Sequence, residues 1–585
     1  SATAVGSQLR ISAQLVATDS AGAAGEEIVV EGPSAALFGL VDSITTRLIA
    51  SRSRTPAERL VRIASRSTHS LPALKHYLVG ASTLRRSQFD SAVAAFTNAA
   101  EIDTTFALAY YGLSLAAEHA TLADLSRSSA EKAARFAARL SPHDQKLVNA
   151  MVASRRGDAV AAERYYNEII ADFPEDVEAW FQLGEVRFHY GPPRGQPIAM
   201  AVTPFRQVLR YEPQNVGVLL HLARIAAGEK DLKGMDSLVR RVESLAPSGN
   251  RTLDMRALRA FGHNDTSSIR GILSEVTSAP DLYVPFIAWQ VSAYLHDLNG
   301  AERVLRVGTH ADRPVEWRAL AYSILAHIEA GRGRWNSSRA ALDSLAVLDP
   351  LKALEHRALL SLEPFLKRPD TELRALRDQL ERTSPPAPSG APSRSSLLTV
   401  DDQLHAFIRT YLLGSLHARL GDLNGARRLA TELEAIKGNP DIQGIARDFA
   451  KSVRAAAEPN PSAALRQLEG MRLQTWYEFA MYSPFYSLAN ERFTRAELAD
   501  KLNREDEALR WFSSFSDFSF FDVRYEAPAH LKRARILARQ KKNALAASHY
   551  RAFLAMWQDA DSQFQPEIIK ARTELAGLSP ATSSR

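Results

Sequence analysis

The run Trp180-Phe181-Gln182-Leu183-Gly184 is followed in this chain by Ala201, Phe205 and Pro213. These residue types at this spacing suit two packed helices. Trp180 is expected to fill the space between them, whereas Gly184 and Ala201 allow two backbones to approach. Pro213 is expected to end the second helix because proline cannot continue one. The run therefore predicts a helical hairpin with one small and one bulky position at each contact.

The spacing of prolines indicates that the hairpin repeats. Pro213 and Pro247 lie 34 residues apart, whereas Pro174 and Pro213 lie 39 apart, and a loop at 191–197 holds the surplus. The period and the order of residue types resemble the tetratricopeptide repeat. That resemblance implies a mostly α fold, an α-solenoid of helical hairpins. The alternative is a non-repeating helical protein in which the run occurs by chance.

Composition limits the class of protein and its partners. The 585 residues are 45% hydrophobic and 24% charged, which suits a chain that buries a large core. A net charge of +6, from 72 basic and 66 acidic residues, is a weak field for this length, so no nucleic-acid contact is predicted. The sequence has no cysteine, which excludes disulfides and thiolate chemistry. It also has no apolar run long enough to span a membrane.

Residues 1–66 predict a small N-terminal α/β segment. Residues 9–16 alternate apolar and polar side chains, and 27–31 follow a turn rich in glycine and alanine, so both are predicted to be strands. Apolar residues between 37 and 49 recur at helical spacing, with Ser34 as the expected cap. Two strands and a helix are too few to be stable alone. We therefore expect either the end of a larger α/β domain, with sequence preceding Ser1, or a cap on the array.

The rest of the chain is predicted to form two repeat arrays. Residues 67–382 form the first and 400–585 the second, which ends in a cap. Between them, 383–399 is a linker rich in proline and serine, with few apolar side chains to order it. The run DLNGA at 297–301 recurs at 422–426, which indicates duplicated hairpins. Its Asn-Gly pair is expected to supply the positive φ of a tight turn between helices.

An aromatic cluster between 511 and 525 has two interpretations. It contains Trp511, Phe512, Phe515, Phe518, Phe520, Phe521 and Tyr525. Exposed, it would be a docking patch for a partner, since apolar surface marks such sites. Buried, it would pack the cap of the second array, and this is the interpretation we favour.

The ends of the chain resemble the C-terminal region of large bacterial regulators. The order strand, strand, helix, then Ser70-Leu-Pro-Ala-Leu74, helical repeats and the closing run 553–561 with Gln565-Pro566 carries the resemblance. Two groups share this order: membrane-anchored serine/threonine protein kinases, and transcriptional regulators with a bacterial transcriptional activator domain. In both groups the chemistry lies N-terminal to this region. The resemblance therefore implies a scaffold or sensor on the cytoplasmic or extracytoplasmic side of a bacterial membrane.

The sequence predicts no catalytic residue, cofactor or metal ligand. The glycine-rich loop and the catalytic and metal-binding motifs of kinases do not occur, and neither does a phosphate-binding loop. The 15 histidines include no His-Glu-x-x-His and no pair at i and i+4, so they are interpreted as polar positions on helices. The chain is therefore predicted not to be an enzyme.

Stacked hairpins form a groove that binds peptides or partner helices. The predicted groove residues are Arg187, Tyr190, His221 and Arg224, which follow the Leu-Gly or equivalent positions. The leading prediction is a protein-binding or signal-sensing scaffold. Two alternatives stay open: a structural subunit, which large apolar outer faces would favour, and an enzyme with a site between repeats, which converging carboxylates in a pocket would favour.

Overall fold

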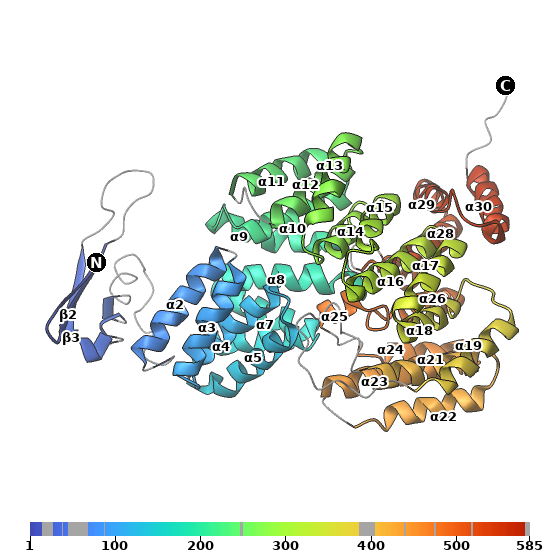
Figure 1. The fold of residues 1–585 in the computed structure, drawn as a ribbon. Coiled ribbons are helices and arrows are strands. Elements are labelled where there is room, and N and C mark those ends of the chain that lie inside the picture. The colour runs from blue at the N-terminus through green and yellow to red at the C-terminus, as the bar shows by residue number, and fades with distance from the viewer. Residues whose placement is uncertain are drawn as a thin grey trace. The chain divides into compact units, whose positions relative to one another are not determined.

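The computed structural model divides the chain into two compact units. It describes residues 1–14, 27–37, 39–41, 43–44, 68, 70–86, 88–245, 250–384, 404–437, 440–472, 476–515 and 519–578. The first unit comprises Ser1–Arg155 and Arg164–Pro174, and the second comprises Arg156–Glu163 and Glu175–Arg585 (Figure 1). Both are built mainly from helices, and among the described residues no helix is long and apolar enough to cross a membrane.

A three-stranded antiparallel sheet begins the first unit. Its strands β1 (Ala2–Val5), β2 (Gln8–Ala13) and β3 (Ile28–Pro33) pair in chain order. The two predicted strands are confirmed as β2 and β3, although Val16 lies outside the described residues. Strand β1 was not predicted because its four residues are all exposed and give no alternation of burial. Gly6, with φ of 60°, makes the two-residue turn between β1 and β2 possible.

The helix expected after Ser34 starts differently from the prediction. It opens with the 3-10 turn η1 (Ser34–Ala36), and Pro33 occupies the cap position with no side-chain hydrogen bond. Ser34 is therefore not the cap. The later part of this predicted helix, from residue 45 onward, lies outside the described residues.

The remaining elements of the first unit are antiparallel helices that pack on their neighbours. They are α2 (Leu71–Arg85), α3 (Phe89–Ile102), α4 (Ala107–His119), α5 (Ala123–Phe136) and α6 (Pro142–Arg155), with α7 (Ala159–Asp172) at the point where the chain divides. Phe96 of α3 fills the space left by two glycines, because a Cβ on Gly80 or Gly112 would come within 2.8 Å or 2.5 Å of its ring.

The second unit continues the pattern of paired helices. Its helices are α8 (Val177–Tyr190), α9 (Val202–Tyr211), α10 (Val216–Gly228), α11 (Leu232–Leu245), α12 (Asn250–Gly262), α13 (Thr266–Ser278), α14 (Tyr283–Ala293), α15 (Leu298–Gly308), α16 (Val315–Gly331), α17 (Trp335–Leu348), α18 (Pro350–Ser361), α19 (Asp370–Arg382), α21 (His405–Arg419), α22 (Leu423–Glu434), α23 (Pro440–Ala456), α24 (Pro461–Glu469), α25 (Tyr477–Tyr482), α26 (Ala489–Lys501), α27 (Glu505–Phe512), α28 (Glu526–Arg539), α29 (Asn543–Met556) and α30 (Gln565–Gly577). The predicted α-solenoid of tetratricopeptide-like hairpins, with a small N-terminal strand region, is the observed fold.

The hairpin α8–α9 shows why the repeat residues are needed. Gly184 lies under the ring of Phe205, which a Cβ would approach to 2.3 Å, and Leu183 and Phe205 are buried. Helix α9 ends two residues before Pro213, as predicted. Trp180 is half-buried between elements of the core. Of the remaining repeat positions, Ala201 is buried but lies in the 3-10 turn η5 (Ile198–Ala201) before α9, and Pro247 lies outside the described residues.

The two DLNGA runs begin helices and do not form turns, which corrects the prediction for their glycines. The Oδ1 atoms of Asp297 and Asp422 accept hydrogen bonds from the backbone N–H groups of Gly300 and Gly425, at 2.8 and 2.9 Å. Each aspartate therefore caps the second helix of its hairpin. The positive φ values fall before the run, 53° at His296 and 85° at Gly421. The runs do occupy matching hairpins, α14–α15 and α21–α22.

The hydrophobic core of the second unit does not stop at the predicted linker. One buried cluster contains Leu354, Leu373 and Leu380 together with Leu404, Ile408 and Leu412, so side chains from both sides of 383–399 pack together. The division into the arrays 67–382 and 400–585 stays a prediction. Residues 385–403 themselves lie outside the described residues.

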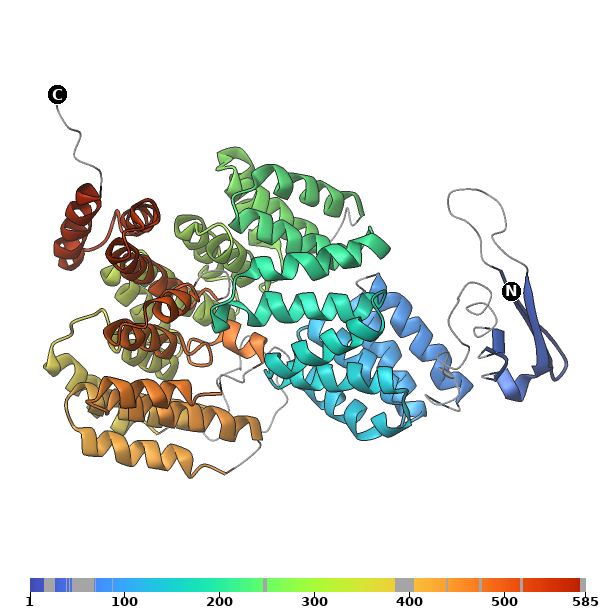
Figure 2. The ribbon, with the colours of Figure 1, turned by 180° about the vertical axis from the view of Figure 1, so that it is seen from behind.

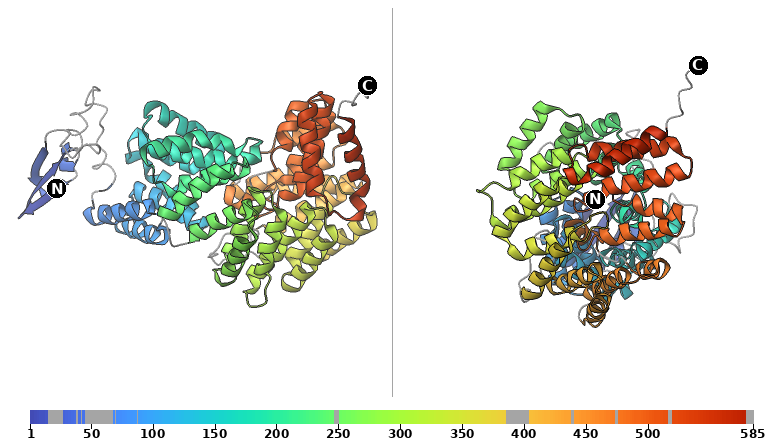
Figure 3. Two further views of the ribbon diagram at one scale, coloured as in Figure 1. Left: turned by 90° about the horizontal axis from the view of Figure 1, so that it is seen from above. Right: turned by 90° about the vertical axis from the view of Figure 1, so that its right-hand side faces the viewer.

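The C-terminal part of the second unit packs back onto its middle. Trp557 Nε1 donates a hydrogen bond to the carbonyl of Gly331 at 3.0 Å, and the Asp561 carboxylate accepts one from Asn336 N at 2.8 Å. Figure 3 shows the red helices α28–α30 beside the yellow-green helices that include α16 and α17. The short orange helix α25 lies next to the end of α8 in Figure 2. Segments that are distant in sequence therefore pack against α8 and α16, the first helices of their hairpins.

Candidate functional site

We call the surface of α8, α16 and α18 that contacts residues 476–485 and 519–525 the inner face. Helix α8 begins at an Asp176 cap, whose carboxylate accepts a hydrogen bond from Ala179 N at 2.8 Å. Helix α10, next to it, begins at an Asn215 cap that accepts one from Val218 N at 3.1 Å. These caps fix where each helix starts, and therefore which side chains of α8 and α10 face each other.

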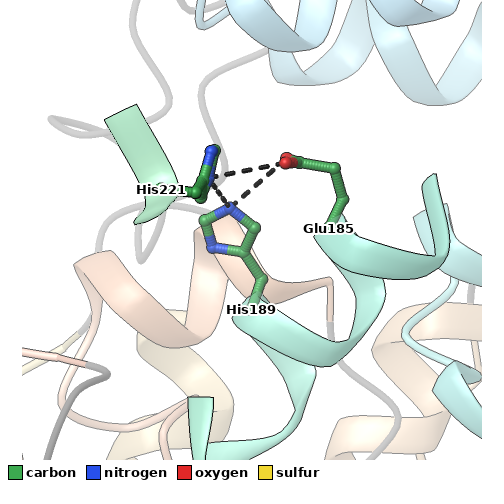
Figure 4. A group of neighbouring side chains, drawn as sticks. All are labelled: Glu185, His189 and His221. Atoms are coloured by element: carbon green, nitrogen blue, oxygen red, sulfur yellow. Dashed lines mark hydrogen bonds and ion pairs between the residues drawn. The ribbon is translucent and has the colours of Figure 1, made fainter. Parts of the chain in front are cut away.

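Three polar side chains meet between α8 and α10. Glu185 and His189 share one side of α8 because they are four residues apart. His221 of α10 points toward both, as Figure 4 shows. His189 Nε2 lies 3.4 Å from His221 Nε2 and 3.5 Å from the Glu185 carboxylate, which is itself 3.5 Å from His221 Nε2. The three side chains are 8–15% exposed, so the group lies at the edge of the core.

The orientation of His221 is fixed by its surroundings. Its Nδ1 lies 2.8 Å from the carbonyl of Gly217, which can only accept, so Nδ1 carries the proton. The ring stands edge-on to Phe188 at 4.5 Å. Burial lowers the pKa of His221 to about 3, and the Glu185 carboxylate opposes that shift only in part. The ring is therefore neutral near pH 7, and its Nε2 presents a lone pair to the group.

The four predicted groove residues do not all lie on an open surface. Tyr190, His221 and Arg224 are buried, with 6%, 6% and 3% of their surface exposed, and Arg187 is half-buried. Arg224 donates from Nε to Gln290 Oε1 at 3.3 Å, and its guanidinium stacks over Trp289 at 5.5 Å. Three of these residues are therefore not ordinary exposed positions on a helix. Partner binding by these residues stays a prediction.

The chain itself covers this end of the inner face. The ring of Tyr477, in α25, stacks on His189 at 4.1 Å and stands edge-on to Tyr190 at 5.6 Å. The Tyr477 backbone N–H also points at the hydroxyl of Tyr190, at 3.4 Å. A short aromatic segment therefore lies where a partner's peptide was predicted to bind.

A second polar group lies farther along the inner face, around Arg524. This arginine is fully buried, and its Nε is 2.6 Å from Glu363 Oε1. Its Nη1 donates to His327 Nδ1 at 3.0 Å, so Nε2–H of His327 donates to Nδ1 of His356, also at 3.0 Å. Burial depresses the pKa of both imidazoles well below 6.5. Burial also raises the pKa of Glu363 to about 8, against the opposing charge of Arg524.

The aromatic residues between 511 and 525 supply part of this covering. The described members of the cluster are all buried, which confirms that they pack and do not form an exposed patch. Phe521 stands edge-on to His327 at 4.9 Å. Phe518 lies outside the described residues.

Sequence reasoning missed the group Glu185, His189 and His221. The sequence has no histidine pair at i and i+4 and no zinc-protease motif, but it does have Glu185 and His189 at Glu-x-x-x-His spacing. That spacing on a helix also places two ligand side chains on one side. It was visible in the sequence, whereas the third member, His221, comes from another helix and could be assigned only from the fold.

Comparison with known proteins leaves the chain unassigned. No protein-family model matches it, and no curated protein does. Among solved structures it is similar to PilW, a widely conserved type IV pilus biogenesis factor (15% identity, 36% of this chain and 94% of that one, TM-score 0.26). It is also similar to the APC/C hetero-tetramer Cut9-Hcn1 (11%, 87% and 97%, 0.26) and to the P58(IPK) TPR domain (12%, 76% and 100%, 0.20). At these scores we base no inference about function on the likeness.

Proposed function

We propose that this chain is a protein-binding scaffold whose inner face receives short aromatic segments. The observation that carries the proposal is that this face already holds such segments of its own chain. Tyr477 binds against α8 through ring stacking. Arg524 binds His327 of α16 through a hydrogen bond and pairs with Glu363, two residues after the end of α18. Aromatic and arginine side chains are the anchors that most often dominate protein interfaces.

The partner chemistry follows from these internal contacts. A partner segment that takes the place of residues 476–485 or 519–525 must carry aromatic rings. It must also carry a hydrogen-bond donor that can reach buried acceptors such as His327 and Glu363. We propose a peptide segment of that kind as the ligand, because its recognition would repeat contacts that the fold already makes. Nucleic acid is not proposed as a partner, since the net charge of +6 is small for the length.

The cellular context is a finer proposal. We propose that the scaffold belongs to a bacterial regulatory protein, either a serine/threonine kinase or a transcriptional regulator with an activator domain. What supports it is the resemblance of the two ends of the sequence, together with the repeat fold between them. The scaffold acts without catalysis, on the cytoplasmic or extracytoplasmic side of the membrane. Chemistry would reside in other parts of such a protein.

Site-specific photo-crosslinking in bacterial cells tests the binding surface. A photoreactive amino acid replaces Arg187, which is half-buried beside the predicted groove. The matched control replaces Arg306 on α15, a helix that is not part of the inner face, where the side chain is 59% exposed. We expect a discrete crosslinked protein from position 187 and none from position 306. Crosslinks from position 306 alone, or from neither position, would remove the support for an inner-face scaffold.

A further inference from the structure

We propose that Glu185, His189 and His221 form a binding site for a zinc-class divalent cation. This inference does not depend on the scaffold function. The three side chains are the one group of metal-binding type that the described residues bring together, with all ligand atoms within 4.8 Å of one another. Two imidazole nitrogens and a carboxylate oxygen are a ligand set that zinc uses in proteins.

The separations within the group fit a coordinated metal. Ligands about 2.05 Å from a tetrahedral zinc ion lie about 3.3 Å apart, as the geometry of a tetrahedron requires. The observed separations are 3.4, 3.5 and 3.5 Å. The three atoms therefore outline one face of a tetrahedron, and a fourth position stays available for water.

The same separations are long for direct hydrogen bonds, whose N···O distances centre near about 2.9–3.0 Å. Other histidine–carboxylate pairs of this unit reach that range. His263 Nε2 lies 3.0 Å from Asp236, and His405 Nδ1 lies 2.9 Å from Glu355. The pairs of His417 with Glu381 and of His530 with Glu526 are longer, at 3.6 and 4.0 Å, but among the described residues neither belongs to a group of three ligand atoms within 4.8 Å of one another. In the proposed site the imidazoles and the carboxylate converge without closing on each other, which leaves room for a cation between them.

The surroundings orient the ligands for a metal. The hydrogen bond from His221 Nδ1 to the Gly217 carbonyl leaves Nε2 as the ligand atom, which is the usual outer-shell arrangement at zinc sites. Stacking on Tyr477 holds the ring of His189. Arg224, the nearby positive charge, has its Nε directed to Gln290 and its guanidinium over Trp289. The ligands come from consecutive hairpins, so a bound ion would tie α8 to α10.

The ligand set also predicts selectivity. Two imidazoles favour zinc, cobalt, nickel and copper ions over calcium and magnesium, which prefer oxygen ligands. A large excess of Mg²⁺ is therefore expected not to displace Zn²⁺.

The test is equilibrium dialysis of the chelator-treated full chain against Zn²⁺, with Co²⁺ as a spectroscopic probe of coordination. We expect one tightly bound ion per chain and the visible absorption of tetrahedral cobalt. The variants are Glu185→Gln and His189→Gln, because their partly exposed side chains can be changed with less damage than His221. The matched control is His263→Gln, which removes an exposed histidine that also faces a carboxylate.

Each ligand variant should weaken Zn²⁺ binding by more than the roughly 10–100-fold that loss of an outer-shell partner costs. The control should bind like the parent chain. Zn²⁺ should also raise the Tm of the parent and control but not of the two ligand variants, whose Tm without metal shows that they fold. Failure of the parent to bind one ion, unchanged binding by folded ligand variants, or an equal loss in His263→Gln would overturn the proposal.

Discussion

Two of the glutamate–histidine groups that the structure describes in the second unit differ in their relation to positive charge. Around α16 and α18, Arg524 enters the group of Glu363, His327 and His356, where it pairs with Glu363 and donates a hydrogen bond to His327. Between α8 and α10, the ligand atoms of the other group face one another at 3.4–3.5 Å. The first group is sealed, with Arg524 and Glu363 at 0% exposure, whereas the second is 8–15% exposed.

The comparison shows that residue type alone does not determine what such a group does. Where the chain supplies an arginine, the glutamate and histidines serve cohesion of the core. Where the side chains converge at the edge of the core, they present a set of ligands. Access to solvent and the origin of the positive charge separate the two roles.

Replacing Arg524 should have the largest effect. Arg524→Met leaves Glu363 and His327 buried without the arginine that contacts both, and each buried polar group left unsatisfied costs about 1–3 kcal/mol. The urea unfolding midpoint of the full chain measures it. As a control, Arg306→Met, at an exposed i,i+4 pair on α15, should change the free energy by about 0.5 kcal/mol or less. A loss below about 1 kcal/mol for Arg524→Met would mean that the sealed group contributes little to cohesion.

A larger side chain at Gly184 on α8 should disturb the packing beneath Glu185, His189 and His221. Gly184→Leu forces side-chain atoms into the ring of Phe205, which packs against His221 at 5.1 Å, and overpacking of this kind costs about 1–3 kcal/mol. Thermal unfolding measures the change.

The matched control for Gly184 is Gly271→Leu on α13, where a Cβ meets nothing within 4 Å. That change should be neutral or stabilising by up to about 1 kcal/mol, because leucine is the better helix former. Equal Tm values for the two leucine variants would show that the contact of Gly184 with Phe205 is not tight.

Acid should weaken the sealed group. The depressed pKa values of His327 and His356 mean that the unfolded chain binds more protons below pH 6.5, so their contribution is lost as pH falls. Glu363 acts in the opposite direction, because its pKa of about 8 lets the folded chain hold a proton that the unfolded chain releases above its ordinary pKa. At roughly 1.4 kcal/mol per pH unit per group, two histidines outweigh one glutamate. The stability of the chain is therefore expected to fall from pH 7 to pH 5.

Urea unfolding at pH 7 and pH 5 measures this dependence. His327→Gln removes one of the two histidines and should flatten the change between the two pH values. The control is His310→Gln at an exposed turn position, which should leave it as in the parent. A pH dependence that His327→Gln does not alter would contradict the assignment to the sealed group.

Removing the ring of Tyr477, which covers His189, should have the smallest effect on stability. Tyr477→Ala removes ring contacts with His189 and Tyr190, which are worth about 1 kcal/mol. Tyr211→Ala, at a residue that is 52% exposed, serves as the control in the same thermal unfolding experiment. Equal destabilisation by Tyr477→Ala and Arg524→Met would mean that both ends of the inner face contribute equally to the stability of the core, contrary to the contrast drawn above.

Much of the fold could be predicted from local patterns. Gly184, Phe205 and Pro213 lie within one hairpin, so their spacing in the sequence is enough to predict its packing. The capping role of Asp297 and Asp422 is likewise local and can be predicted once the start of the helix is known. Strand β1 escaped because all its side chains are exposed. The Asn-Gly pair of DLNGA predicts a turn, but its glycine lies in the first turn of a helix. There it leaves room for the carboxylate of the capping aspartate, which a Cβ on Gly300 or Gly425 would approach to 2.3 Å.

The candidate site could be predicted only in part, because its residues meet through long-range packing. The spacing of Glu185 and His189 is local, but His221 joins from the next hairpin. The covering of Tyr190 by Tyr477 joins residues 287 positions apart. No period in the sequence encodes that return, so the groove was predicted to be open.

The contact of Asp561 with Asn336 spans 225 residues, and it has a consequence for synthesis of the chain. At 5–20 residues per second, a ribosome needs roughly 10–45 seconds to make the intervening segment. During that interval α16 and α17 have emerged, but Arg524, Trp557 and Asp561 have not. At that stage residues 519–525 do not yet cover the inner face. The nascent chain therefore exposes apolar side chains, and charged side chains that are buried in the folded protein, to chaperones and to other chains. Completion of the last hairpins, and not of each repeat in turn, therefore sets the time at which the second unit becomes fully folded.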